Sequence, residues 1–81
     1  MKSKEILETI LKSFVRNPDD VKVERKVDEM GVLLEVEVNK DDKGLIIGRK
    51  GETIKAIQKV VRAVGLKNRE RVAIKFKQNN V

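Results

Sequence analysis

The apolar residues near the start of the chain recur at spacings of three and four, which is the period of an amphipathic α-helix. The pattern predicts a helix that begins at about Ser3, with that serine as its N-cap. The helix should end before Asn17-Pro18, because the residue before a proline avoids the α region. The predicted buried stripe consists of Ile6, Leu7, Ile10, Leu11, Phe14 and Val15.

The next two segments alternate apolar and polar residues, which is the pattern of strands with one buried face. In residues 21–27 the valines share one parity, and Arg25 breaks it, which places this strand near a sheet edge. In residues 32–38 one parity is aliphatic and the other carries glutamates. The four residues 28–31, Asp-Glu-Met-Gly, predict a tight reversal between them, so the two strands should form a hairpin.

Aliphatic residues on each side of the tetrapeptide Gly-Arg-Lys-Gly at 48–51 predict two further helices. The first is short, is capped by Asp41 or Asp42, and runs through residues 45–47 into the tetrapeptide. The second begins at the end of the tetrapeptide and stops at Gly65, its expected C′ residue. Its predicted buried side consists of Ile54, Ile57, either Val60 or Val61, and Val64.

A last strand is predicted at residues 71–77, and the polar tail at 78–81 is expected to fray. The inward side chains of that strand are Val72, Ile74 and Phe76. The element order is therefore α-β-β-α-α-β in a single domain, residues 1–81. Because each strand has one apolar face, the helices should cover one face of a three-stranded sheet in a two-layer α+β fold. The last strand can pair in parallel beside residues 32–38 or join the other edge, and the pattern leaves both open.

Charge is unevenly distributed along the chain. Residues 1–39 carry 7 Lys/Arg against 9 Asp/Glu, a net of −2, whereas residues 40–81 carry 12 against 4, a net of +8. A polyanion, nucleic acid before membrane, is the natural partner of the second half. A lysine-rich surface that only keeps the domain soluble is the competing interpretation. No apolar run approaches the roughly 20 residues of a membrane span, so we expect a cytoplasmic protein with no membrane partner.

The side chains that most enzymes use for catalysis are missing, since the chain has no His, Cys, Trp or Tyr. The two tight aspartate pairs, at residues 19–20 and 41–42, precede predicted regular elements. Helix capping or solvation of a strand edge explains them better than metal binding. We therefore expect a non-catalytic protein that uses no metal and no cofactor.

The tetrapeptide at 48–51 is suited to holding an anion. Glycine at each end allows positive φ and removes β-carbons that would keep a ligand away. The free amides and positive dipole end of the following helix point out of this turn, beside Arg49 and Lys50. Phosphate fits such a site. The alternative is a plain exposed turn with one glycine as a C-cap and the other as a hinge.

The flanks of the tetrapeptide extend this hypothesis. The aliphatic residues at 45–47 and Ile54 exceed what the core requires, which leaves some of them to line a groove for bases. A basic stripe on the second helix consists of Lys55, Lys59 and Arg62. Both phenylalanines occupy core parities, so we do not expect an exposed aromatic platform for base stacking.

Residues 46–57, IIGRKGETIKAI, resemble the signature of KH domains, an I-G-x-x-G followed by two spaced isoleucines. The predicted element order is that of the type II, prokaryotic KH fold, which implies parallel pairing of residues 32–38 with 71–77 and hence a mixed sheet. Nearly the whole chain is similar to the KhpA family of small bacterial RNA-binding proteins. The resemblance implies that the RNA backbone contacts Gly48, Arg49, Lys50 and Gly51, and that bases contact Ile47, Ile54 and the outer side of the last strand.

The same resemblance implies a single-stranded RNA-binding protein that acts as an RNA chaperone or post-transcriptional regulator. It implies a homodimer, a complex with a second KH protein, KhpB, and a role in cell-envelope and cell-shape homeostasis. It also implies that the acidic turn at residues 28–31 flanks the groove, where it would weaken phosphate binding. Two other functions stay open: a protein–protein assembly module with weak nucleic-acid binding, and a binder of single-stranded DNA.

Overall fold

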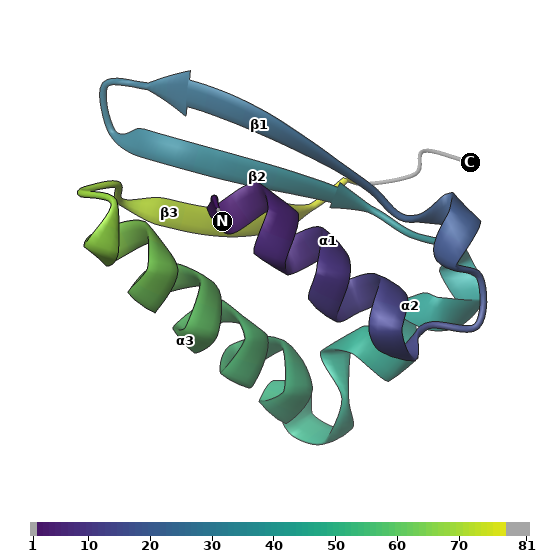
Figure 1. The fold of residues 1–81 in the computed structure, drawn as a ribbon. Coiled ribbons are helices and arrows are strands. Elements are labelled where there is room, and N and C mark those ends of the chain that lie inside the picture. Colours follow the sequence, from purple (N-terminus) through teal and green to yellow (C-terminus); the bar gives the residue numbers. More distant parts are fainter. Residues whose placement is uncertain (1, 78–81) are drawn as a thin grey trace.

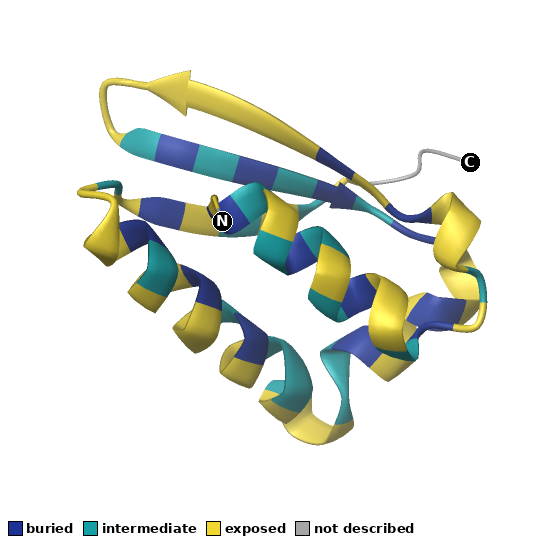
Figure 2. Ribbon diagram, viewed as in Figure 1, coloured by how far each residue is buried: buried dark blue, intermediate teal, exposed yellow. Residues whose placement is uncertain are grey.

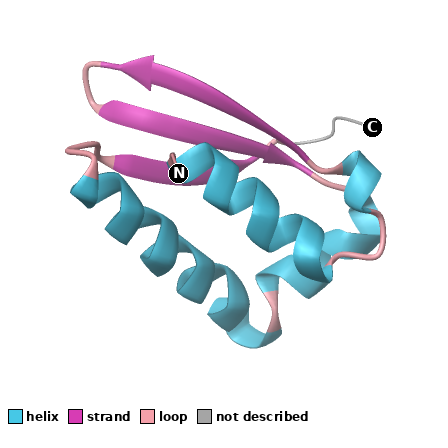
Figure 3. Cartoon of the chain, in the orientation of Figure 1, coloured by secondary structure: helices cyan, strands magenta, loops and turns pink. Residues whose placement is uncertain are grey.

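The computed structural model describes residues 2–77 (Figure 3). Their elements follow the predicted order α-β-β-α-α-β, with two added 3₁₀ turns, and the predicted fraying at residues 78–81 lies outside the described residues. The elements are α1 (Ser3–Phe14), the 3₁₀ turn η1 (Pro18–Asp20), β1 (Lys22–Asp28), β2 (Gly31–Glu37), α2 (Lys40–Ile47), the 3₁₀ turn η2 (Arg49–Gly51), α3 (Glu52–Lys67) and β3 (Val72–Phe76).

Strand β2 is the middle strand of the sheet, whose order is β1-β2-β3. It pairs antiparallel with β1 and parallel with β3, with Val32 opposite Val72 and Val36 opposite Phe76. The three helices lie on the same side of the sheet (Figure 1). The two-layer α+β fold with a mixed sheet is therefore confirmed, and the parallel pairing is the one of the two alternatives that the chain adopts.

The core lies between β2 and the helices, as the alternating burial along β2 shows (Figure 2). Leu34 of β2, two leucines of α1 and Val61 of α3 are at most 1% exposed, whereas Val60 is 50% exposed. Of the two valines left open by the pattern, Val61 is thus the core residue. Val27 has the inward parity but is 61% exposed, because the hairpin end of the edge strand β1 reaches beyond the helices.

The predicted N-cap of α1 is wrong by one residue. Lys2 occupies the cap with extended φ and ψ and makes no side-chain cap hydrogen bond. Ser3 lies one and two turns before Leu7 and Leu11, so it shares their buried face and is 1% exposed. Because its side chain points into the core, Ser3 cannot turn back to cap the helix.

The predicted end of α3 at Gly65 is also wrong, because the helix continues to Lys67. It ends in a turn in which Arg69 has φ 59° and the Glu70 N–H donates to the Gly65 carbonyl at 2.7 Å, the pattern of a Schellman motif. A β-carbon at Gly65 would lie 2.5 Å from Cγ2 of Val72. This glycine therefore serves the close approach of α3 to β3 rather than the helix end.

Candidate nucleic-acid interface

The tetrapeptide Gly48–Gly51, here called the glycine loop, connects α2 to α3 at the lower edge of the view in Figure 1. Three of its four residues have positive φ: 75° at Gly48, 56° at Lys50 and 73° at Gly51. The side chains of Arg49 and Lys50 are exposed. The loop thus presents two cations from a backbone conformation that favours glycine at both ends.

The two glycine positions differ in how strictly they require glycine. Gly48 combines φ 75° with ψ −179°, a region that only glycine readily occupies, and a β-carbon there would lie 2.7 Å from Cβ of Thr53. Gly51 is in the ordinary left-handed region, and a β-carbon at that position would have Cε of Lys55, 4.0 Å away, as its nearest neighbour. Gly48 is therefore needed for the fold of the loop, whereas Gly51 leaves open space where a ligand can approach.

The N-terminus of α3 begins directly at this loop. Gly51 is its N-cap, and no side chain accepts a hydrogen bond from the first-turn amides. Helix α3 has 16 residues, so it carries a full macrodipole with its positive end at the loop. Two backbone amides are already used within the turn, because the Gly51 N–H donates to the Gly48 carbonyl at 3.3 Å and the Glu52 N–H donates to the Arg49 carbonyl. The positive end of the helix dipole and the two loop cations nevertheless meet at one exposed place.

Helix α2 is positioned by Asp42 rather than capped by it. The N-cap of α2 is Asn39, whose side-chain oxygen accepts from the Asp41 N–H at 2.9 Å. Asp42 is fully buried and accepts hydrogen bonds from the Arg16 N–H at 3.1 Å, the Asn17 N–H at 3.0 Å and the Asn17 amide at 3.2 Å. The prediction that an aspartate caps α2 is wrong, and Asp42 instead ties α2 to the chain that leaves α1.

Burial by itself would raise the pKa of the Asp42 carboxyl, because an ionised group loses its hydration there. The hydrogen bonds from Arg16 and Asn17, with the positive charge of Arg16, more than offset this and hold the pKa of Asp42 below its ordinary value. Asp42 is thus ionised at neutral pH. The anchor of α2, and through it the start of the glycine loop, is a charged hydrogen-bonded carboxylate.

The aliphatic flanks of the loop divide between core and surface. Ile46 is fully buried, Ile47 and Ile54 are partly buried, and Leu45 is 45% exposed. The two isoleucines expected at the base groove therefore keep accessible surface beside the glycine loop. Their side chains can contact both the core and a ligand.

The basic stripe Lys55, Lys59 and Arg62 is exposed along α3, as the pattern predicts. Arg62 also lines a hollow of about 290 Å³ between α3 and β3, together with Leu66, Glu70, Arg71, Val72 and Ala73. Within residues 2–77, no carboxylate lies within 4.0 Å of these cations or of Arg49 and Lys50. Their charge is consequently available to an external anion.

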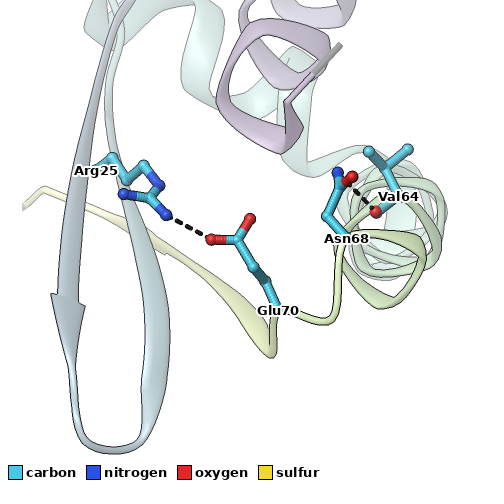
Figure 4. Close-up of polar contacts among 4 residues, drawn as sticks. All are labelled: Arg25, Val64, Asn68 and Glu70. Carbon is cyan, nitrogen blue, oxygen red and sulfur yellow. Dashed lines mark hydrogen bonds and ion pairs between the residues drawn. The ribbon is translucent and has the colours of Figure 1, made fainter.

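The opposite end of α3 is closed by internal contacts (Figure 4). The Asn68 amide donates to the Val64 carbonyl at 3.2 Å, and the Arg25 guanidinium forms an ion pair with Glu70. The turn at residues 28–31 also lies at this end, because the Val32 N–H donates to the Arg71 carbonyl at 2.8 Å. Over 16 residues α3 spans about 24 Å. The turn therefore lies at the opposite end of α3 from the glycine loop, and its effect on phosphate binding along the groove stays a prediction.

One contact, between Lys43 of α2 and Phe76 of β3, was not predicted from the sequence. Phe76 is only partly buried, and Nζ of Lys43 lies 5.9 Å from the centre of its ring. The parity of Phe76 in its strand indicates a core residue, and Lys43 belongs to no motif. The only available signal was that Phe76 ends an edge strand, where the helical layer covers it less completely.

Two general findings concern the described part of the chain. None of its helices is both long enough and apolar enough to cross a bilayer. Residues 2–77 also hold no group of three or more acidic, histidine or cysteine side chains arranged to bind a metal ion.

The fold and the loop together define a class. An α-β-β-α-α-β domain with a mixed sheet and a Gly-x-x-Gly turn between its second and third helices is a KH domain of type II. The chain belongs to the KhpA/KhpB KH domain family, whose model matches residues 4–76. Because KH domains are binding modules, this membership confirms the prediction of a non-catalytic protein.

The chain is similar to several curated proteins over most of its length. It is 40% identical over 73 residues to the RNA-binding protein KhpA of Clostridium acetobutylicum, covering 90% of this chain and 97% of that one. It is 48% identical over 61 residues to the KhpA of Streptomyces coelicolor, covering 75% and 77%. A solved structure of Aquifex aeolicus Era, bound to GDP and aluminium fluoride, aligns with a TM-score of 0.58 and 23% identity over 91% of this chain and 29% of that chain. The last likeness is one of fold alone.

Proposed function

We propose that this protein binds single-stranded RNA without catalysis and holds the RNA backbone with the glycine loop. The observation that carries the proposal is the exposed pair Arg49 and Lys50, without carboxylate partners within residues 2–77. The pair lies between two positive-φ glycines at the N-terminus of α3, which no side chain caps. Phosphate is a ligand that interacts favourably with both the cations and the positive end of the helix dipole. The names of the curated relatives, RNA-binding protein KhpA, favour RNA as the polyanion.

A single strand suits this surface better than a duplex. The loop is a small protrusion beside partly buried isoleucines, Ile47 and Ile54, which offer apolar contact to unstacked bases. Bases become accessible in this way only in single strands and loops. With few phosphate contacts, the affinity of one domain should be modest and should fall with salt at about 0.7 of a log unit per phosphate neutralised and per log unit of salt.

The finer parts of the proposal rest on the resemblance to the KhpA family. They are a role as RNA chaperone or post-transcriptional regulator in the cytoplasm, a complex with KhpB, and a contribution to cell-envelope and cell-shape homeostasis. A weakly binding domain would gain affinity from such a partner, because two linked sites bind one RNA by avidity.

The test is reversal of the two loop charges. We expect Arg49→Asp with Lys50→Asp to remove binding of a labelled single-stranded RNA, measured by fluorescence anisotropy, because phosphate then meets two carboxylates. The matched control, Lys2→Asp with Lys26→Asp, changes the net charge equally on exposed residues of the α1 cap and β1. It should keep most of the affinity. Circular dichroism should show the same fold in both variants.

Two results would reject parts of the proposal. Full RNA binding by the loop variant would exclude the glycine loop as the site. Equal affinity for a DNA oligomer of the same sequence, across a range of salt concentrations, would show that the protein does not prefer RNA to single-stranded DNA. It would then be a general binder of single strands.

A second candidate function is a protein–protein assembly module, in a homodimer or with another KH protein. The observation that favours it is the number of large apolar side chains left exposed for a chain of 81 residues: Val27, Met30, Leu45, Val60 and Leu66 are 45–77% exposed. Sedimentation equilibrium of the pure protein tests it. A monomer at all concentrations that also fails to bind KhpB would rule it out.

A further inference from the structure

Phe76 is the last residue of β3, which is an edge strand. Like Ile74, it occupies a core position of that strand, packs against the core and is only partly buried. The exposed side chain of Lys43 reaches its ring, with Nζ 5.9 Å from the ring centre. One part of the ring therefore faces a solvated side chain instead of the core.

The contact between Lys43 and Phe76 is of a kind that a ligand can replace. A cation–π contact at an exposed site is weak, because the ammonium group gives up hydration to make it. A nucleobase offers a flat π surface to the same ring, and stacking of a base on an aromatic side chain is a strong and sequence-tolerant interaction. The lysine displaced from the ring has a four-carbon stem and can follow the phosphate of the stacked nucleotide.

The position of Lys43 connects this ring to the proposed RNA site. Ile47 follows Lys43 by four positions on α2, so the two residues lie on the same face of that helix, about one turn apart. Ile47 directly precedes the glycine loop. A single-stranded RNA that is bound at the glycine loop and runs along α2 would contact Ile47 first and then Lys43 and Phe76.

The charges around the ring suit this path. Lys43 forms no ion pair within residues 2–77, and the residues on either side of Phe76, Lys75 and Lys77, are exposed cations. Phe14 is the only other aromatic residue, and it belongs to α1. Phe76 is consequently the one aromatic ring on the elements that border the glycine loop and β3.

We propose that Phe76 and Lys43 form a stacking subsite for one nucleobase at the α2 end of the groove, with the base on the ring and the lysine on its phosphate. The inference rests on the proposed binding of single-stranded RNA. It also replaces the expectation from strand parity that no aromatic ring is available to bases. Since purines present a larger stacking surface than pyrimidines, the subsite favours a purine.

A tryptophan substitution tests the contact directly. The chain has no tryptophan or tyrosine, so Phe76→Trp creates a single strong fluorophore at the subsite. We expect short oligoadenylate to quench its emission, because a stacked base quenches indole. The matched control is Phe14→Trp on α1, the other partly buried phenylalanine, whose emission should not change.

The affinity test uses substitutions that keep apolar bulk. Phe76→Leu should weaken oligoadenylate binding about fivefold or more and oligouridylate binding less, whereas Phe14→Leu should leave both unchanged. Lys43→Ala should lower the affinity for both and reduce its salt dependence by about one phosphate contact.

The outcomes separate this inference from the proposed function. If charge reversal in the glycine loop abolishes binding while Phe76→Leu binds both oligomers as the native protein does, and Phe76→Trp is not quenched, the stacking subsite is rejected and the RNA site at the loop stands. If charge reversal in the loop leaves binding intact, the proposed function fails first. Quenching of Phe76→Trp equal to that of Phe14→Trp would likewise contradict the subsite.

Discussion

The two ends of α3 use similar residues for opposite purposes. Each end has a non-glycine residue with positive φ, Lys50 before the helix and Arg69 after it. Each end is also rich in cations. At the C-terminal end the polar groups are satisfied within the protein, through the Asn68 cap, the Glu70–Gly65 backbone bond and the Arg25–Glu70 ion pair. At the N-terminal end no side chain caps the helix, and Arg49 and Lys50 have no acidic partner among residues 2–77.

The helix dipole sharpens this contrast. Cations are favourable at a helix C-terminus and unfavourable at an N-terminus, by about 0.3–1 kcal/mol each. Lys67 and Arg69 therefore stabilise α3, whereas Arg49 and Lys50 oppose its dipole. The two loop cations are therefore unfavourable to the helix dipole, and an anionic ligand would reverse the sign of both interactions. The difference between the ends thus separates a turn closed by internal contacts from the proposed binding site.

The largest effect is expected at Gly48. Replacing it by alanine forces a β-carbon into Thr53 and a backbone region that only glycine readily occupies, so we expect Gly48→Ala to lower the free energy of unfolding by about 2–4 kcal/mol. Urea denaturation followed by circular dichroism measures this. Gly51→Ala is the matched control, since its β-carbon meets only open space and its cost should stay near 1 kcal/mol. Equal losses at the two glycines would contradict the distinction between Gly48, which the fold of the loop needs, and Gly51, which borders open space.

The second effect concerns the anchor of the open end, the buried carboxylate of Asp42. Its pKa is lower in the folded protein than in the unfolded chain, so its contribution to stability is present at neutral pH and is lost as pH falls through the folded pKa. We expect Asp42→Asn to be destabilising at pH 7, and the difference from the native protein to shrink below about pH 4.

Chemical denaturation of both proteins at a series of pH values measures this dependence. Asp41→Asn is the control, because Asp41 is exposed and is bonded only through its backbone N–H. A difference between Asp42→Asn and the native protein that stays constant down to the acid limit would contradict the assignment of an ionised anchor.

The sequence predicts the parts of this fold that depend on one element at a time. The periodicity of α1 and the alternation of β2 are local consequences of facing one core, and the glycine loop is recognisable because its glycines and cations are adjacent. The parts that were missed depend on partners distant in sequence. Asp42 bonds to residues 25 and 26 positions away, Gly65 makes room for Val72, and Phe76 is only partly buried because β3 lies at the sheet edge. An acidic residue near a helix start or a glycine near a helix end has the same local appearance whichever of these tasks it performs.

The smallest effect is also the one that tests the comparison most directly, because its sign differs between the two ends. Arg49→Asp with Lys50→Asp should raise the free energy of unfolding by about 0.5–1 kcal/mol while removing RNA binding, because carboxylates suit a helix N-terminus. Lys67→Asp with Arg69→Asp makes the same change of charge at the C-terminus, where we expect a loss of about 0.5–1 kcal/mol. Urea denaturation at low ionic strength measures both, and added salt should reduce both differences. If the loop variant is instead less stable than the native protein, the loop cations serve the fold, and the distinction between an open and a closed end of α3 fails.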